Sequence, residues 1–209
     1  MLRNIRKNYE QLQLDEKDLT SHPFDLFQVW LADAIKNRQD EPTAMTLSTC
    51  ADGQPDSRMV LLKELNQNGF VFFTNYNSTK GVQIEGNNQV ALNFFWSRLE
   101  RQVRIKGVSE KLDEEQSTDY FHSRPRESQL GAWASWQSSE IKDREELESR
   151  FSYYRDFFEG QDVKKPDHWG GYLIIPTQIE FWQGRANRLH DRIRYVLKED
   201  QWFISRLAP

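Results

Sequence analysis

The sequence is poor in several features that mark common protein classes. It has one cysteine, Cys50, among 209 residues, so it can form no intrachain disulfide and no zinc site built on several cysteines. Its apolar runs are short, as at 59–62 and 70–73, and none is long enough to span a bilayer. The phosphate-binding signatures G-x-G-x-x-G and G-x-x-x-x-G-K-[ST] are absent. A disulfide scaffold, a transmembrane helix and the common nucleotide-binding loops are therefore excluded.

Net positive charge is also lacking. The chain has 28 basic and 32 acidic residues, a formal net charge of −4, which argues against a nucleic-acid partner. The histidines show no metal-ligand spacing, so no metal is expected. The first 19 residues are charged throughout and lack the apolar core of a signal peptide, which predicts a cytoplasmic protein without a membrane partner.

The remaining composition predicts a folded chain. Aromatic residues make up 13%, which favours a packed core over disorder. Residues 1–20 are polar and predict a mobile N-terminal arm, and residues 21–209 predict one domain. After His22-Pro23, apolar residues recur at helical spacing from Phe24 to Ile35, so we expect a helix that ends near Asn37.

From Pro42 onward the apolar period changes to two, which is typical of strands. Strands are expected at 43–50, 57–65, 70–74, 89–95, 102–112, 169–175, 179–182, 192–197 and 202–207. Helices are expected at 77–85, 113–122, 127–133 and 140–158. Many short strands joined by turns favour a mainly β (α+β) fold, an antiparallel barrel or sandwich, over a parallel α/β sheet.

Four cationic clusters stand out against the acidic background. In the first, Arg58 and Lys63 bracket an apolar strand. Their odd spacing places them on opposite faces of a regular strand, so they can serve one pocket only if a bulge intervenes. Solvated strand ends are the simpler interpretation of each charge.

The second and third clusters have the donors that phosphate needs. Thr74 to Lys80 joins a strand end to a helix start and could hold a phosphate, although an ordinary N-cap with a surface lysine is the favoured interpretation. Tyr120, Arg124 and Ser128 recur at a spacing of four, which would put them on one helix face. Pro125 interrupts that helix, so a helix C-terminus that favours cations remains the alternative.

The fourth cluster places Arg185, Arg188, His190, Asp191 and Arg192 within eight residues. A surface turn with ion pairs would explain it, but the neighbouring aromatic residues at 181–182 suggest a site beside buried surface. His190-Asp191 could belong to a hydrolytic triad, yet no G-x-S-x-G elbow accompanies it.

Taken together, these segments resemble the pyridoxine/pyridoxamine 5′-phosphate oxidase family. The resemblance extends from about residue 6 to the end. It rests on RMVLLK, FFTNYNSTK, LERQVRIKG, YFHSRPRESQLGAWAS, QSS, HWGGY, IEFWQG, RLHDR and the closing RLAP, in the family's order.

The resemblance implies an antiparallel split β-barrel that binds FMN at a homodimer interface. It implies oxidation of pyridoxine or pyridoxamine 5′-phosphate to pyridoxal 5′-phosphate, with hydride passing from C4′ to flavin N5 and O₂ reoxidising the flavin to give H₂O₂. The implied FMN contacts are Arg58, Met59, Val60, Leu61, Leu62, Lys63, Phe73, Thr74, Lys80, Gln102, Gln137, Ser138, Trp182 and Arg192. The implied substrate contacts are Arg6, Tyr9, Lys63, Tyr120, Arg124, Ser128, Arg188 and His190, and the last two are the implied catalytic residues.

Two positions depart from the family pattern. Thr79 stands where the family commonly has Arg, and Phe73 stands where Tyr is frequent, which bears on FMN affinity more than on activity. Two other functions remain open at this stage. A non-catalytic carrier or sensor of pyridoxal 5′-phosphate would bind the vitamer without flavin turnover, and a split-barrel flavin reductase would not need Tyr120, Arg124 and Ser128.

Overall fold

The computed structural model describes residues 2–4 and 7–209. Short 3₁₀ turns occupy Leu2–Asn4, Glu16–Asp18 and Ala186–Arg188. The helices are α1 (Pro23–Lys36), α2 (Thr79–Gly86), α3 (Glu114–Ser123), α4 (Arg126–Ala134) and α5 (Arg144–Phe157). The strands are β1 (Ala44–Ala51), β2 (Gln54–Leu61), β3 (Glu64–Leu65), β4 (Phe70–Asn75), β5 (Gln89–Trp96), β6 (Arg101–Lys111), β7 (Trp169–Gln183), β8 (Asp191–Lys198) and β9 (Gln201–Arg206).

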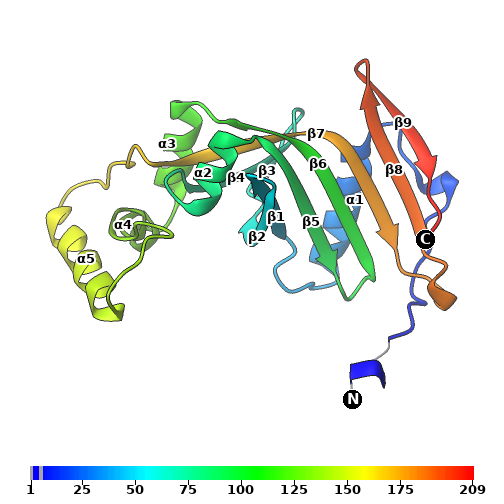
Figure 1. The fold of residues 1–209 in the computed structure, drawn as a ribbon, viewed down its shortest axis with the longest axis horizontal. Coiled ribbons are helices and arrows are strands. Elements are labelled where there is room, and N and C mark those ends of the chain that lie inside the picture. The colour runs from blue at the N-terminus through cyan, green and yellow to red at the C-terminus, as the bar shows by residue number, and fades with distance from the viewer. Residues whose placement is uncertain (1, 5–6) are drawn as a thin grey trace.

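The strand pairings of the described residues are all antiparallel, in the order β2-β1-β5-β6-β7-β4-β3. Strand β8 also pairs with β7, and β9 pairs with β8. The sheet curves around α1, while α3, α4 and α5 gather at the opposite end of the molecule (Figure 1). The predicted antiparallel, mainly β fold with inserted helices is confirmed.

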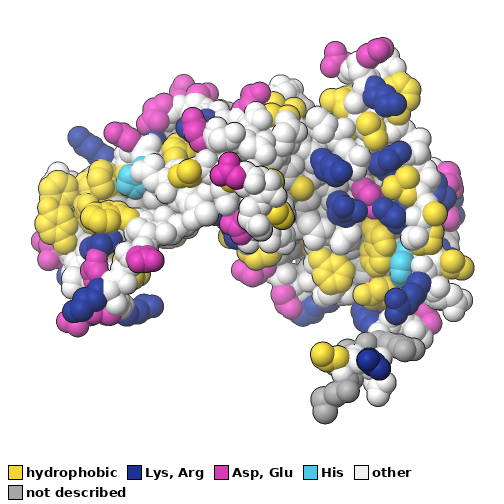
Figure 2. Space-filling view, in the orientation of Figure 1, with side chains coloured by type: hydrophobic (Ala, Val, Ile, Leu, Met, Phe, Trp, Pro, Cys, Tyr) yellow, Lys and Arg dark blue, Asp and Glu magenta, His cyan; other side chains and the backbone are white. Residues whose placement is uncertain are grey.

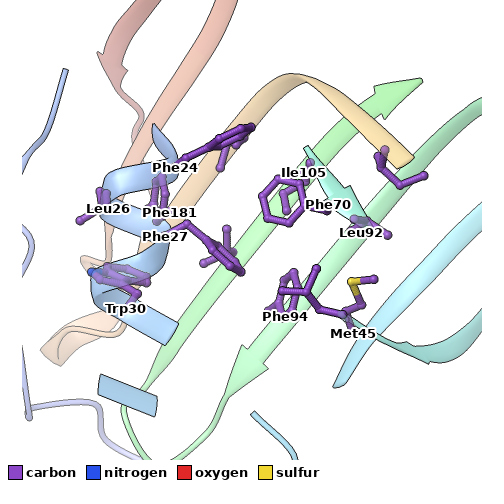
Figure 3. Close-up of a cluster of buried hydrophobic side chains, with 14 of the residues drawn as sticks. Phe24, Leu26, Phe27, Trp30, Met45, Phe70, Leu92, Phe94, Ile105 and Phe181 are labelled. Atoms are coloured by element: carbon purple, nitrogen blue, oxygen red, sulfur yellow. The ribbon is translucent and has the colours of Figure 1, made fainter. Parts of the chain in front are cut away.

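Helix α1 fills the concave side of the sheet. It begins where the His22 ring accepts a hydrogen bond from the Phe24 N–H, with Pro23 at the first helical position. Phe27 is fully buried and its ring lies 5.0 Å from that of Phe70 (Figure 3). Trp30 packs 5.2 Å from Phe181 in the same core. Aromatic edge-to-face contacts of this kind fix how the helix sits against β4 and β7.

The strand predicted at 57–65 is divided into β2 and β3. The Leu62 N–H bonds to Thr43 O on the β1 side, whereas the Lys63 N–H bonds to Val71 O in β4. The chain thus leaves one partner strand and joins another between consecutive residues. This break removes the strict alternation that would otherwise place Arg58 and Lys63 on opposite faces.

The strands predicted at 169–175 and 179–182 form one strand, β7, and this prediction was wrong. Strand β6 pairs with β7 along its length, with a register shift between Lys106 and Gly107 opposite Pro176. A Cβ on Gly107 would lie 2.3 Å from Ile175 O, so this glycine permits the close approach. The other edge of β7 pairs first with β4 and then with β8. Pro176 therefore marks a change of partner within a continuous strand.

Within the described residues, no helix is long and apolar enough to cross a membrane.

Candidate functional site

A cavity of about 640 Å³ lies among β2, β4, the start of α2, α3, α4 and the start of β7. It collects most of the residues implied for FMN and for the substrate phosphate. Those in its wall are Met59, Val60, Leu61, Lys63, Phe73, Thr74, Lys80, Tyr120, Arg124, Ser128 and Gln137.

Lys80 supplies a buried positive charge at this cavity. It is 8% exposed, and its ammonium bonds only neutral oxygens, those of Thr74, Ser78 and Gln137, at 3.1–3.3 Å. Burial lowers the pKa of Lys80, and the positive charge of Arg58 lowers it further. A buried ammonium among neutral acceptors is costly, and a bound anion would reduce that cost.

Arg58 is held in place by a set of side chains from three elements. Its guanidinium donates to Thr49 Oγ1 at 2.7 Å, to Gln83 Oε1 at 2.9 Å and to the Asp56 carboxylate. The Asp56 pKa is lowered by hydrogen bonds from Gln83 and the Ser57 N–H and by the Arg58 charge. Thr49 and Gln83 carry no motif signal of their own, so the sequence did not reveal them.

Arg124 supplies a second positive charge with unused hydrogen-bonding capacity. One terminal nitrogen donates to Ser128 O at 2.8 Å, while the other is buried without a partner. Burial lowers the Arg124 pKa, which the charge of Tyr120 would oppose. A buried guanidinium N–H that lacks an acceptor, in a cavity wall, indicates an anion site.

The spacing of four at Tyr120, Arg124 and Ser128 does not place them on one helix. Helix α3 ends at Ser123, Arg124 has extended backbone angles, and α4 begins at Arg126. The three side chains nevertheless line the same cavity. The interruption at Pro125 therefore turns the chain without separating the cluster.

A stack of aromatic rings forms one wall of the cavity. The Phe73 and Tyr120 rings lie 3.8 Å apart and nearly parallel, and Trp169 lies 5.6 Å from Phe73. The Arg124 guanidinium lies 4.5 Å from the Trp169 ring. A Cβ on Gly171 would come within 2.8 Å of Phe73, so this glycine of the HWGGY segment leaves room for the stack.

The other implied FMN residues form a row across three strands. Gln102 in β6 lies opposite Trp182 in β7, which lies opposite Arg192 in β8. Their neighbours Val103, Phe181 and Ile193 point into the core, so the row is on the outer face of the sheet. Figure 2 shows Lys and Arg side chains gathered over β6 to β8 beside hydrophobic ones. The nearly buried Glu180 carboxylate accepts from Arg192 Nε at 2.9 Å and so orients it.

His190 and Arg188 lie beside this row. The His190 ring is 4.6 Å from Trp182, and its Nδ1 accepts a hydrogen bond from the Arg185 N–H at 3.0 Å. Burial lowers the pKa of His190, and the Arg188 charge lowers it further against the opposing effect of Asp191. Arg188 is exposed. Both Arg188, at φ 62°, and the preceding Asn187, at φ 57°, have left-handed backbone conformations. Because Nδ1 accepts the Arg185 N–H, the proton of the neutral imidazole is on Nε2.

The cavity and the row are at opposite ends of β7. Trp169 is in the cavity wall and Trp182 is in the row, thirteen residues further along an extended strand. A strand of that length covers about 40 Å. One chain alone therefore does not bring the two groups of predicted residues together.

The remaining predicted residues have different surroundings. Leu62 is 5% exposed and packs in the core, so its side chain does not reach the cavity. Ser138 and Thr79 line an adjoining hollow of about 630 Å³ that shares Gln137 with the cavity. Tyr9 packs against Trp182. Arg6 lies outside the described residues.

Comparison with known proteins gives a consistent result. A family model described as pyridoxamine 5′-phosphate oxidase matches residues 31–158, and a second, described as the pyridoxine 5′-phosphate oxidase C-terminal dimerisation region, matches 169–209. The chain belongs to the pyridoxamine 5′-phosphate oxidase family. Pyridoxine/pyridoxamine 5′-phosphate oxidases of Synechocystis and Trichormus variabilis are 51% and 50% identical to it, and the alignments cover at least 97% of each chain.

Solved structures confirm the family's fold. PhzG from Burkholderia lata, solved with tetrahydrophenazine-1-carboxylic acid, is 28% identical and covers 97% of this chain and 100% of its own, with a TM-score of 0.90. A pyridoxamine 5′-phosphate oxidase-related, FMN-binding protein from Nostoc punctiforme has a TM-score of 0.70 at 14% identity, over 91% of this chain and 100% of its own, and shows the fold alone. The match to the dimerisation region supports a homodimer.

The environment of His190 predicts its titration. Its pKa should lie below the ordinary value of about 6.5, and Arg188→Ala should raise it, because that change removes the second cause of the shift. Histidine-selective NMR across pH 4–9 measures it. Arg155→Ala, an exposed cation on α5, is the matched control and should leave the His190 pKa unchanged. A His190 pKa above 6.5, or one that Arg188→Ala does not raise, would contradict this assignment.

Proposed function

We propose that this chain is an FMN-dependent oxidase that converts pyridoxine 5′-phosphate and pyridoxamine 5′-phosphate to pyridoxal 5′-phosphate, with O₂ as final electron acceptor and H₂O₂ as product. One observation carries the proposal: the same cavity holds the buried Lys80 and the half-buried Arg124, one terminal nitrogen of which is buried without a partner. Among the described residues these two cations share no hydrogen-bond partner and pair with no carboxylate. Two separate phosphate anchors suit a flavin mononucleotide and a phosphorylated substrate.

The residues present fit FMN. Lys80 and Arg58 would face its phosphate, with Thr74, Gln137 and Ser138 as further hydrogen-bonding groups. Thr79 adds a hydroxyl at the adjoining hollow but no charge. Met59, Val60 and Leu61, at the edge of β2, offer backbone groups and apolar contacts to the ring system. Bound FMN would supply the two-electron acceptor for oxidation at the substrate C4′.

The substrate phosphate would bind at the second anchor. Four donors line this part of the cavity: the unpaired N–H of Arg124, the Tyr120 phenol, the Ser128 hydroxyl and the Lys63 ammonium. Arg124 is stacked on Trp169, so its guanidinium is oriented before any ligand arrives. These four residues favour the oxidase over a flavin reductase, because a flavin reductase does not need a second phosphate-binding site.

A second copy of the chain would complete the site with the row on β6 to β8 and its two neighbours. These residues are Gln102, Trp182, Arg192, Arg188 and His190. A single chain places this group at the far end of β7, and the family's dimerisation region includes Trp182, Arg188, His190 and Arg192. The site would then lie at the interface of a homodimer. Arg188 would cover the open face of the substrate ring, and the neutral His190 would orient its polar groups. A cytoplasmic location remains part of this proposal.

Flavin colour tests the function directly. Purified protein should be yellow, and pyridoxamine 5′-phosphate added without oxygen should bleach the flavin band, because electrons pass to the flavin and cannot leave it. Readmitted air should restore the band and produce H₂O₂. Pyridoxamine without phosphate is the control and should bleach far more slowly. Tight vitamer binding without bleaching would support the carrier alternative instead.

The second anchor predicts the effect of Arg124→Ala. Loss of one set of charge-assisted hydrogen bonds of about 1.5–3 kcal/mol should raise KM for pyridoxamine 5′-phosphate by about 10–150-fold. The flavin content should change little, because Arg124 has no contact with the Lys80 group. Steady-state kinetics and the flavin absorbance measure both. Arg144→Ala removes an exposed cation paired with Glu148 and is the matched control. An unchanged KM in Arg124→Ala would contradict the assignment.

A further inference from the structure

Glu100 is a buried acid that the proposed reaction does not use. It lies in the turn between β5 and β6, is 1% exposed, and has a left-handed backbone with φ 55°. Its carbonyl accepts the Gly184 N–H at 2.7 Å, which ties the turn to the end of β7 beside Trp182. A carboxylate so enclosed requires partners, because an unpaired buried charge is strongly destabilising.

The partners of this carboxylate come from the N-terminal arm. Oε2 accepts the main-chain N–H groups of Glu10 at 2.9 Å and Gln11 at 3.2 Å. Oε1 lies 3.2 Å from Lys7 Nζ, whose side chain is 54% exposed. The two main-chain bonds are charge-assisted and partly buried, whereas the lysine pair is open to solvent and contributes less.

These bonds determine where Tyr9 lies. Its ring is 5.6 Å from Trp182 and 5.9 Å from His190, edge-on to both. A Cβ on Gly184 would come within 2.7 Å of the Tyr9 side chain, so that glycine leaves the space the tyrosine occupies. Glu100 thus contacts the arm directly after Tyr9 and the chain two residues after Trp182, at Gly184.

The next part of the arm is anchored separately. The buried Leu14 donates its N–H to Asp191 at 3.1 Å, and its carbonyl accepts from Arg206 at 3.0 Å. Loss of the Glu100 bonds would therefore free the arm before residue 14 and leave the rest of the chain in place.

We propose that Glu100 is a positioning residue for the oxidation: its carboxylate docks the N-terminal arm through the Glu10 and Gln11 N–H groups and thereby holds Tyr9 over Trp182 and His190. This proposal rests on the proposed function, because Trp182 and His190 there contact the flavin and the substrate. Tyr9 in this place covers one side of the ligand site and excludes water from it. The mobility predicted for residues 1–20 would then be limited by this contact.

Glu100→Gln in the full-length holoenzyme tests the proposal. The amide keeps the shape and the turn but replaces one acceptor oxygen with a donor beside Lys7 and the two N–H groups. Hydrogen–deuterium exchange of residues 7–13 should become much faster than in wild type. KM for pyridoxamine 5′-phosphate should rise by about tenfold, with kcat changed less, because the docked arm adds to substrate binding.

A double-mutant cycle with Tyr9→Ala separates positioning from general destabilisation. If Glu100 acts through Tyr9, Glu100→Gln should add little to the KM of Tyr9→Ala. Lys17→Ala, an exposed cation beyond the Leu14 anchor, is the matched control and should change arm exchange and KM by less than about threefold. Should Glu100→Gln fold poorly, Glu100→Asp keeps the charge but withdraws it from the arm, and should free the arm in the same way.

Two results would overturn the proposal: unchanged exchange of the arm in both Glu100 variants, or effects of Glu100→Gln and Tyr9→Ala on KM that multiply. Arm exchange is measured without turnover. A protein that fails to oxidise the substrate but loses arm protection in Glu100→Gln therefore contradicts the proposed function and not the docking role of Glu100.

Discussion

The buried ammonium of Lys80 is the constraint on which the rest of the site depends. Its protein partners are neutral oxygens, and the nearby Arg58 adds a like charge instead of neutralising it. The unfavourable free energy of burying this charge is offset by the aromatic core around α1, which holds β4 and β7 in place. A bound phosphate would convert that cost into binding free energy, and Arg124 repeats the arrangement at the second anchor.

The length of β7 separates the cavity residues from the row that contains Trp182. Its first half pairs with β4 and reaches the cavity, and its second half pairs with β8 and carries Trp182. The two groups of predicted residues therefore lie at opposite ends of one strand. In the proposed dimer each copy lends its row to the other's cavity, so folding, assembly and ligand binding depend on one another.

Much of the fold could be predicted from local signals, and the site only in part. Period-two runs predicted most of the strands, and α3 begins after its N-cap Asp113, where the helix was expected. The continuity of β7 through Pro176 could not be predicted, because proline usually ends a paired strand and its partners here are distant in sequence. Motif resemblance placed Arg124 and Lys80. Glu100 lies in one of the quoted segments, but its contacts with the N-terminal arm, like those of Gln83 with Arg58, join residues distant in sequence and could not be predicted.

A mixed dimer tests the central claim, that one site draws on two copies. A dimer purified with one Arg124→Ala chain and one Arg188→Ala chain has one site with both changes and one with neither, if each site combines the cavity of one copy with the row of the other. It should regain about half of the wild-type oxidase activity although both parent homodimers are impaired. Activity no higher than that of the parents would place both residues in the same chain's site and contradict the account.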